Sequence, residues 1–233
     1  MPTTSLDPDR VEKELADVTN AVTFEATEFM QRFASGGVPK ENLARFAASY
    51  CYQVDQFKRF VAAVYANAEP RDVRELMLEN LWEEHGEGDP ERDHTVLVAR
   101  FGRALGAEIP DPYDVEPIPE GRQWIQRILR VCQEEHFVVG LAAISFGIEF
   151  RTGTMAFLGQ IYRDQYGLSE QDLEFFFMHL EADEEHAGRA IELVRKYCTT
   201  EELLERSKWG VQEVLEATRV LAGGFERVAS SSE

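Results

Sequence analysis

The stretch FMHLEADEEH, residues 177–186, carries the pattern on which the interpretation of this sequence depends. His179, Asp183 and His186 stand at positions i, i+4 and i+7, so at about 100° per residue they fall within a helical arc of roughly 60°. One face of one helix thus offers two imidazoles and a carboxylate, a nitrogen and oxygen donor set typical of iron or manganese. The chain has five histidines in all, so two of them on one stripe favour a metal site over a surface helix that carries them without that role.

The rest of the chain has the periodicity of helices. Apolar residues recur every three or four positions over nearly the whole length, and no segment alternates with period two for long enough to make a convincing strand. This pattern predicts an all-α fold with one helical domain over residues 1–233, frayed at 1–8 and 223–233. We expect helices over about 8–34, 40–67, 70–85, 90–106, 120–165 with joints near 134–136 and 151–153, 169–197, and from 200 onward. An irregular connection is expected at 107–119.

Composition sets the broad class. The chain has 233 residues, 44% hydrophobic content and a formal charge of -19, which suits one domain with a sizeable core and predicts no binding to nucleic acid or anionic lipid surfaces. Its three cysteines are far apart, which indicates neither a disulfide framework nor a zinc site. We find no secretory leader and no apolar run of about 18 residues, so we expect a cytoplasmic protein without a membrane span.

Glu149 lies in a segment, 137–150, with hardly another charge. A buried, unpaired carboxylate costs several kcal/mol, so protonation, an arginine such as Arg151 or a metal ion must compensate it. The residues around it leave metal ligation and a structural ion pair both open.

A third candidate element is the segment 80–86, which contains Glu83 and Glu84 and is followed by His94. A carboxylate and an imidazole would be brought together across a turn. The alternative is an ordinary helix end with a capped surface histidine. His136, beside two acids, is expected to mark a helix joint.

Together these elements supply three carboxylates and three imidazoles, an inventory that matches two divalent ions. Helical bundles build dinuclear carboxylate sites from ligands that project inward from several helices, and Asp183-x-x-His186 has the same i, i+3 spacing as the Glu-x-x-His element of such sites. The six candidate metal ligands are Glu83, His94, Glu149, His179, Asp183 and His186.

In these motifs the sequence resembles the haem-oxygenase-like diiron oxidases, also described as iron-containing redox enzymes, over about residues 20–190. The resemblance implies a haem-oxygenase-like bundle of about seven helices, often dimeric, in which two ferrous ions held by those six residues react with dioxygen. Manganese is a possible substitute. The implied substrate is a small amine, amino acid or fatty acid, which would be N-oxygenated, cleaved at a C-C bond or desaturated. The choice between Glu83 and Glu84 stays open, as does an extra ligand at Asp55.

One branch of the family, the para-aminobenzoate synthases, consumes its own tyrosine with help from a lysine near the metal. By the same resemblance, that tyrosine is replaced near Met30 and that lysine near Gly159, which argues against the self-sacrificing reaction. Aromatic side chains that would line the substrate pocket, if they are not simply core, are Phe137, Phe146, Phe150, Phe176 and Tyr162.

Two alternatives use the same bundle differently. A metal-independent enzyme, thiaminase-like or a cofactor-free oxidase, would need other chemistry, and for the thiaminase-like case Cys51 is the one cysteine that would qualify as a nucleophile. A non-catalytic protein that stores iron or docks a partner would need no substrate cavity. Fold alone does not separate these functions.

Overall fold

The computed structural model describes residues 6–22, 27–151 and 153–230; the side chains of 151 and of 179–187 lie outside this description. Over the described ranges the chain forms ten α-helices, three short 3-10 helices and no strand. The α-helices are α1 Pro8–Ala21, α2 Glu28–Ala34, α3 Lys40–Asn67, α4 Arg71–Glu84, α5 His94–Ala104, α6 Pro119–Glu134, α7 Phe137–Gly147, α8 Gly153–Tyr166, α9 Glu174–Tyr197 and α10 Glu201–Ser230. The 3-10 helices are η1 Gly86–Gly88, η2 Pro90–Arg92 and η3 Glu149–Arg151.

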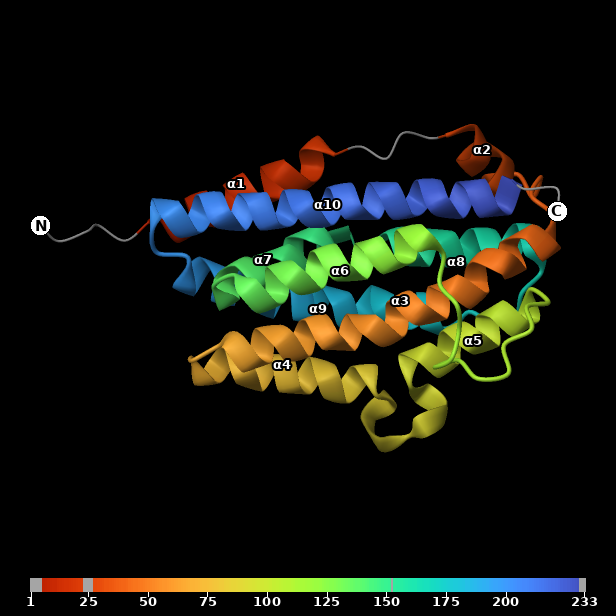
Figure 1. Cartoon of the computed structure of the whole chain (residues 1–233), viewed down its shortest axis with the longest axis horizontal. Helices are drawn as coiled ribbons and strands as arrows, with labels where there is room; N and C mark the ends of the chain where they lie inside the picture. The colour runs from red at the N-terminus through yellow and green to blue at the C-terminus, as the bar shows by residue number, and fades with distance from the viewer. Residues whose placement is uncertain (1–5, 23–26, 152, 231–233) are drawn as a thin grey trace, which may run out of the picture.

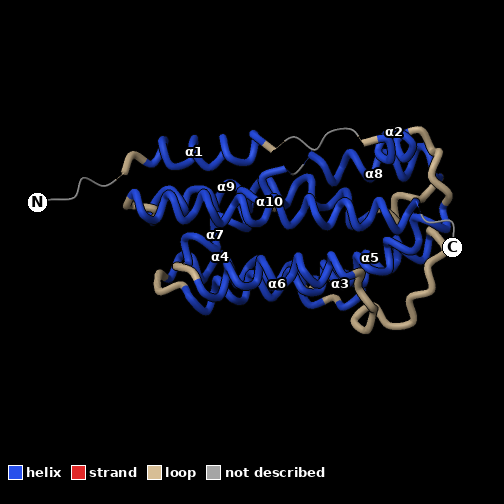
Figure 2. The backbone as a smooth tube through the Cα atoms, turned by 45° about the horizontal axis from the view of Figure 1, so that its top comes forward, coloured by secondary structure: helices blue, strands red, loops and turns tan. Residues whose placement is uncertain are grey.

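The helices form an elongated bundle whose long members run roughly along its length (Figure 1). The 30 residues of α10 lie against α6 and α7, and α3 packs on α4, α5 and α6. The view in Figure 2 shows the same alignment and the connection from α5 to α6 as the longest loop of the bundle. The all-α prediction is therefore confirmed, although the described helices outnumber the seven expected.

Two hydrophobic clusters divide the core along the bundle. The larger cluster joins α1, α3, α4, α6, α7, α9 and α10, with α7 buried along almost its whole length. The second cluster joins α2, α3, α5, α8 and the start of α9, and it is rich in aromatic rings. The sequence of α7 is apolar on every face, so the helix is stable only where other helices surround it.

Three helix boundaries differ from the sequence predictions, and in two of them a capping hydrogen bond sets where the helix begins. The single helix expected over 8–34 is two helices, and the Thr27 hydroxyl starts the second by accepting from Met30 N at 3.2 Å. The helix expected from residue 90 begins at His94, because the Asp93 side chain caps it by accepting from Thr95 N at 2.9 Å. Residues 223–230 are not frayed as expected: α10 continues to Ser230, with Ala229 2% exposed, and 231–233 lie outside the described residues.

The other boundaries follow the predictions closely. The joints near 134–136 and 151–153 and the connection at 107–118 lie where periodicity breaks. One exception is the helix expected over 169–197, which begins at Glu174 after a turn in which Ser169 and Asp172 exchange two hydrogen bonds. No helix among the described residues combines the length and apolarity that a membrane crossing requires.

Candidate metal centre

Two of the candidate ligands meet where α4 ends and α5 begins. His94 Nδ1 lies 3.0 Å from Glu84 Oε2, and both side chains are buried. The connection between them turns back at Gly86, whose φ of 78° belongs to the left-handed region. A Cβ atom at Gly86 would lie 2.6 Å from Asp93 N, so a larger residue there would push the two helix ends apart. The turn therefore brings a carboxylate and an imidazole from the two helix ends into contact.

Glu149 adds a second buried carboxylate close to this pair. It begins η3 and is 9% exposed, and Asn80 Nδ2 of α4 donates to its Oε1 at 3.5 Å. Burial, followed by the negative charge of Glu84, raises the pKa of Glu149 to about 7. Two carboxylates from separate helices thus repel one another in the interior, which is the electrostatic arrangement that a bound cation would relieve.

The pKa of His94 is also shifted by burial and by the charge of Glu84, but for this cationic group the two effects oppose each other. Burial alone would lower its pKa, but the neighbouring Glu84 carboxylate outweighs burial, so the pKa of His94 is raised from its ordinary value. A cation that bound here would displace a proton from this group, because a metal ligand must be deprotonated.

The third part of the predicted site, His179, Asp183 and His186, lies on α9, but these side chains are outside the described residues. The described residue nearest to them with a contact to the site is Phe175, whose ring meets that of His94 edge-on with centroids 5.8 Å apart. His179 follows Phe175 by four residues, one helical turn. Among the described side chains, no group of three or more potential ligands lies close enough to hold a metal ion.

The structure distinguishes between the two adjacent acids at the end of α4. Glu84 is 8% exposed and contacts His94, whereas Glu83 is half-buried. Neighbouring helical residues point about 100° apart, so only one of them can face the α5 terminus directly. Glu84 is the acid that contacts His94, whereas the sequence pattern singled out Glu83 and left the choice between the two open.

The other candidates from the sequence lie elsewhere. The half-buried Asp55 accepts from Gln56 at 2.7 Å. His136 caps α7, with Nδ1 accepting from Val138 N at 3.3 Å, as expected of a joint. Of the candidate wall residues, Phe137, Phe146 and Phe150 belong to the larger hydrophobic cluster and Phe176 and Tyr162 to the aromatic one.

A buried ion pair beside the site was missed by sequence reasoning. Lys58 Nζ of α3 lies 2.7 Å from Asp93 Oδ1 and 2.8 Å from Oδ2, and both side chains are buried. Burial would raise the pKa of Asp93, but the hydrogen bonds and charge of Lys58 lower it below its ordinary value. The one feature of the sequence that could have drawn attention to the pair was Asp93, which stands at the N-cap position before a helical segment.

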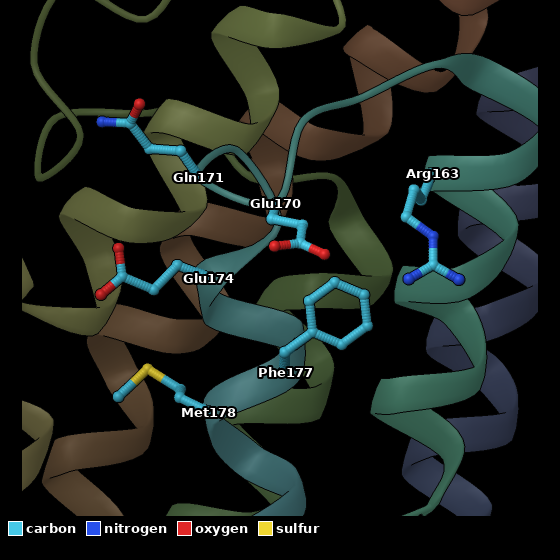
Figure 3. A pocket seen from close by; sticks show the side chains of 6 residues that line it. All are labelled: Arg163, Glu170, Gln171, Glu174, Phe177 and Met178. Carbon is cyan, nitrogen blue, oxygen red and sulfur yellow. The ribbon is translucent and has the colours of Figure 1, made fainter.

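An open pocket of about 580 Å³ lies at the start of α9 (Figure 3). Figure 3 shows Arg163 facing Phe177, with Glu170 above the Phe177 ring, and the Arg163 guanidinium carbon lies 5.9 Å from the centroid of that ring. Phe177 is two residues beyond Phe175 on the same helix, which places its side chain about 160° away from the face that contacts His94. Glu174 and Met178 also line the pocket, so it covers the part of α9 beside the face that contacts His94.

Similarity to solved structures defines the class of fold. A protein from Shewanella denitrificans, described as a domain of unknown function with a heme oxygenase-like fold, has a TM-score of 0.77 and 18% identity and covers 95% of this chain and 93% of its own. A TenA homolog from Pseudomonas syringae pv. tomato has a TM-score of 0.74 and 13% identity, with coverage of 96% and 94%. The fold is haem-oxygenase-like.

Sequence comparison defines the family. Residues 44–219 match the family described as "Iron-containing redox enzyme", and the chain belongs to it. Two relatives named 4-aminobenzoate synthase are similar as well. The protein from Nitrosomonas europaea is 28% identical over 203 residues, 82% of this chain and 78% of its own. The protein from Chlamydia pneumoniae is 26% identical over 169 residues, 72% and 74%.

Proposed function

We propose that this chain is a non-haem diiron oxidase or oxygenase, which activates dioxygen to oxidise a small organic molecule such as an amino acid, an amine or a fatty acid. The observation that carries this proposal is the buried contact between Glu84 of α4 and His94 of α5, with the buried Glu149 carboxylate of η3 near enough for the charge of Glu84 to raise its pKa. In this account Glu84 takes the ligand role that the sequence pattern gave to Glu83. His179, Asp183 and His186 complete the set from α9.

The donor types of the described residues suit divalent cations, and the proposed two-ion site needs the α9 residues as well. Glu84 and Glu149 are buried and repel each other, and Asn80 Oδ1 beside them is buried with no hydrogen-bond partner among the described residues. Buried polar atoms without partners are rare, and a bound cation or water molecule would satisfy Asn80 Oδ1. Oxygen and imidazole donors without thiolate suit iron, or manganese as a substitute.

Each described group has a task in binding. Glu84 and His94 are close enough to bind one cation together. Glu149, which accepts the hydrogen bond from Asn80 Nδ2, would add a second negative charge near Glu84. The ring of Phe175 covers His94 and keeps water from that side. When bound, the two metal ions supply the electrons and the open coordination positions that dioxygen activation requires.

This proposal is tested by loading the protein anaerobically with ferrous iron and then adding oxygenated buffer. We expect two Fe(II) ions per chain and rapid oxygen uptake, measured with an oxygen electrode. A candidate amino acid, amine or fatty acid that is the substrate should accelerate this uptake or be converted to an oxidised product. Metal-free protein is the control. Two tightly bound ions without oxygen uptake would point instead to iron storage.

A second candidate is synthesis of 4-aminobenzoate, the activity in the names of the relatives. The packing of α8 against α9 bears on it, because a Cβ atom at Gly159 would lie 2.9 Å from the Cβ of Phe176 and 3.1 Å from the ring of Phe177. A lysine side chain has no room at this position. We therefore expect that iron-loaded protein under oxygen releases no 4-aminobenzoate and keeps its intact mass, as measured by mass spectrometry. Release of 4-aminobenzoate with a matching loss of protein mass would favour this second candidate.

The thiaminase-like alternative is disfavoured by the state of Cys51. Burial raises the pKa of this thiol to about 12, and Sγ donates to Ala47 O at 3.7 Å. A thiol that stays protonated at neutral pH is a poor nucleophile. We further propose a cytoplasmic homodimer, for which sedimentation velocity is the direct test of assembly.

A further inference from the structure

The buried ion pair between Lys58 and Asp93 lies beside the proposed metal centre, because Asp93 directly precedes the proposed ligand His94. Lys58 Nζ donates to both Asp93 oxygens and to Thr95 Oγ1 at 3.1 Å, so the ammonium group is fully engaged by α5. It is therefore not a free amine that could react. The pair joins the middle of α3 to the first turn of α5.

Asp93 is the point at which several segments meet. Its side chain caps α5 through Thr95 N, and His85 Nδ1, at the end of α4, lies 3.3 Å from Asp93 Oδ2. Tyr113, from the long connection between α5 and α6, lies over Lys58 with Nζ 5.9 Å from its ring centroid. The ion pair thus links the start of α5 to three other segments: α3, the end of α4 and the connection between α5 and α6.

The connection from α4 to α5 needs such a restraint. Gly86 and Gly88 have positive φ angles, and Glu87 between them has a φ of 55°, which is strained for a residue with a side chain. A strained conformation of this kind persists only when the surrounding structure holds it in place. The ion pair holds the end of the segment at which His94 enters α5.

We propose that Lys58 and Asp93 act as positioning residues, which hold the α4–α5 turn in the conformation that brings Glu84 and His94 together and so set the affinity of the metal centre. The inference rests on the proposed function for the identity of the bound metal, but the conformational part stands without metal. Partners that orient ligands from outside the ligand set typically change metal affinity by about 10- to 100-fold.

The test separates positioning from folding by removing both charges at once. Single removal of Lys58 would leave Asp93 buried and unpaired, which destabilises a protein strongly, whereas replacing both members of a buried pair is often neutral. The variant Lys58→Met/Asp93→Ser keeps an N-cap hydroxyl for α5. The matched control is Lys13→Met/Asp17→Ser, which removes an exposed ion pair on α1.

Two readouts are measured on each protein. In the metal-free state, hydrogen exchange of the amides of 85–95 should become at least about tenfold faster in the Lys58→Met/Asp93→Ser variant, at nearly unchanged melting temperature. With cobalt(II) as a spectroscopic probe, its affinity should fall by about 10- to 100-fold and its d–d absorption bands should change. The control should match the wild type in both.

Wild-type exchange rates at 85–95 in the double variant would overturn the proposal, whether or not any metal binds. Faster exchange with unchanged cobalt affinity and spectrum would overturn the link to the metal centre. If the wild type itself binds no cobalt or iron, the proposed function fails, and the exchange experiment still decides whether the pair holds the turn.

Discussion

Replacing Glu149 with glutamine is expected to stabilise the metal-free protein at pH 8 by about 3 kcal/mol. The folded state raises the pKa of Glu149 from 4.5 to about 7, so between these values the folded chain binds more protons than the unfolded chain. Stability from this group is therefore fully present below pH 4.5 and is lost as the pH rises through 7. Above pH 7 the buried charge destabilises the fold, and glutamine removes that charge while keeping nearly the same volume.

The measurement is the free energy of unfolding by urea at pH 5 and pH 8, in the presence of a chelator. Glu149→Gln should gain stability over the wild type at pH 8 and little at pH 5. Glu91→Gln, at an exposed position in η2, is the control and should match the wild type at both. With ferrous iron added anaerobically the order should reverse, because only the wild type gains binding energy. A variant less stable than the wild type at pH 8 would mean that Glu149 has a structural cation partner, as in the ion-pair alternative.

Replacing Glu84 with glutamine is expected to weaken ferrous binding by more than about 100-fold, because loss of a ligand exceeds the 10- to 100-fold effect typical of groups that only orient ligands. Glu84 is the acid in contact with His94, and it also raises the pKa of Glu149. The neighbouring Glu83→Gln change removes the same charge from the same helix end, so it is the matched control and should retain affinity within about threefold.

Both variants are measured by anaerobic titration with ferrous iron followed by isothermal calorimetry. The effect of Glu84→Gln on the free protein is also informative, because removal of its charge should lower the pKa of Glu149. A greater loss of ferrous affinity in Glu83→Gln than in Glu84→Gln would make Glu83 the ligand. If both variants kept the wild-type ferrous affinity, neither acid at the end of α4 would be a metal ligand.

Most of the helical framework follows from the sequence because apolar periodicity reports which face of a segment is buried. The helix over 40–67 and the joint at His136 lie where the pattern changes. The break before Thr27 and the start of α5 at His94 were not predicted, since each is set by one capping hydrogen bond rather than by a run of residues.

The sequence left one part of the candidate site open for a similar reason. Spacing singled out His94 and Glu149, but which of Glu83 and Glu84 faces His94 depends on a rotation of about 100° at a helix end, which periodicity does not fix. The ion pair between Lys58 and Asp93 joins residues 35 positions apart and carries no local signal. Only the packing of α3 against α5 brings them together.

The central claim is that two iron ions lie between the described acids and α9. Crystals of the iron-loaded protein, with diffraction recorded on both sides of the iron absorption edge, test it most directly. The account predicts two anomalous peaks about 3.5–4 Å apart, one of them beside Glu84 and His94 and both within reach of Glu149. Peaks confined to the acidic surface, or no peak in the interior of a fully loaded crystal, would contradict it.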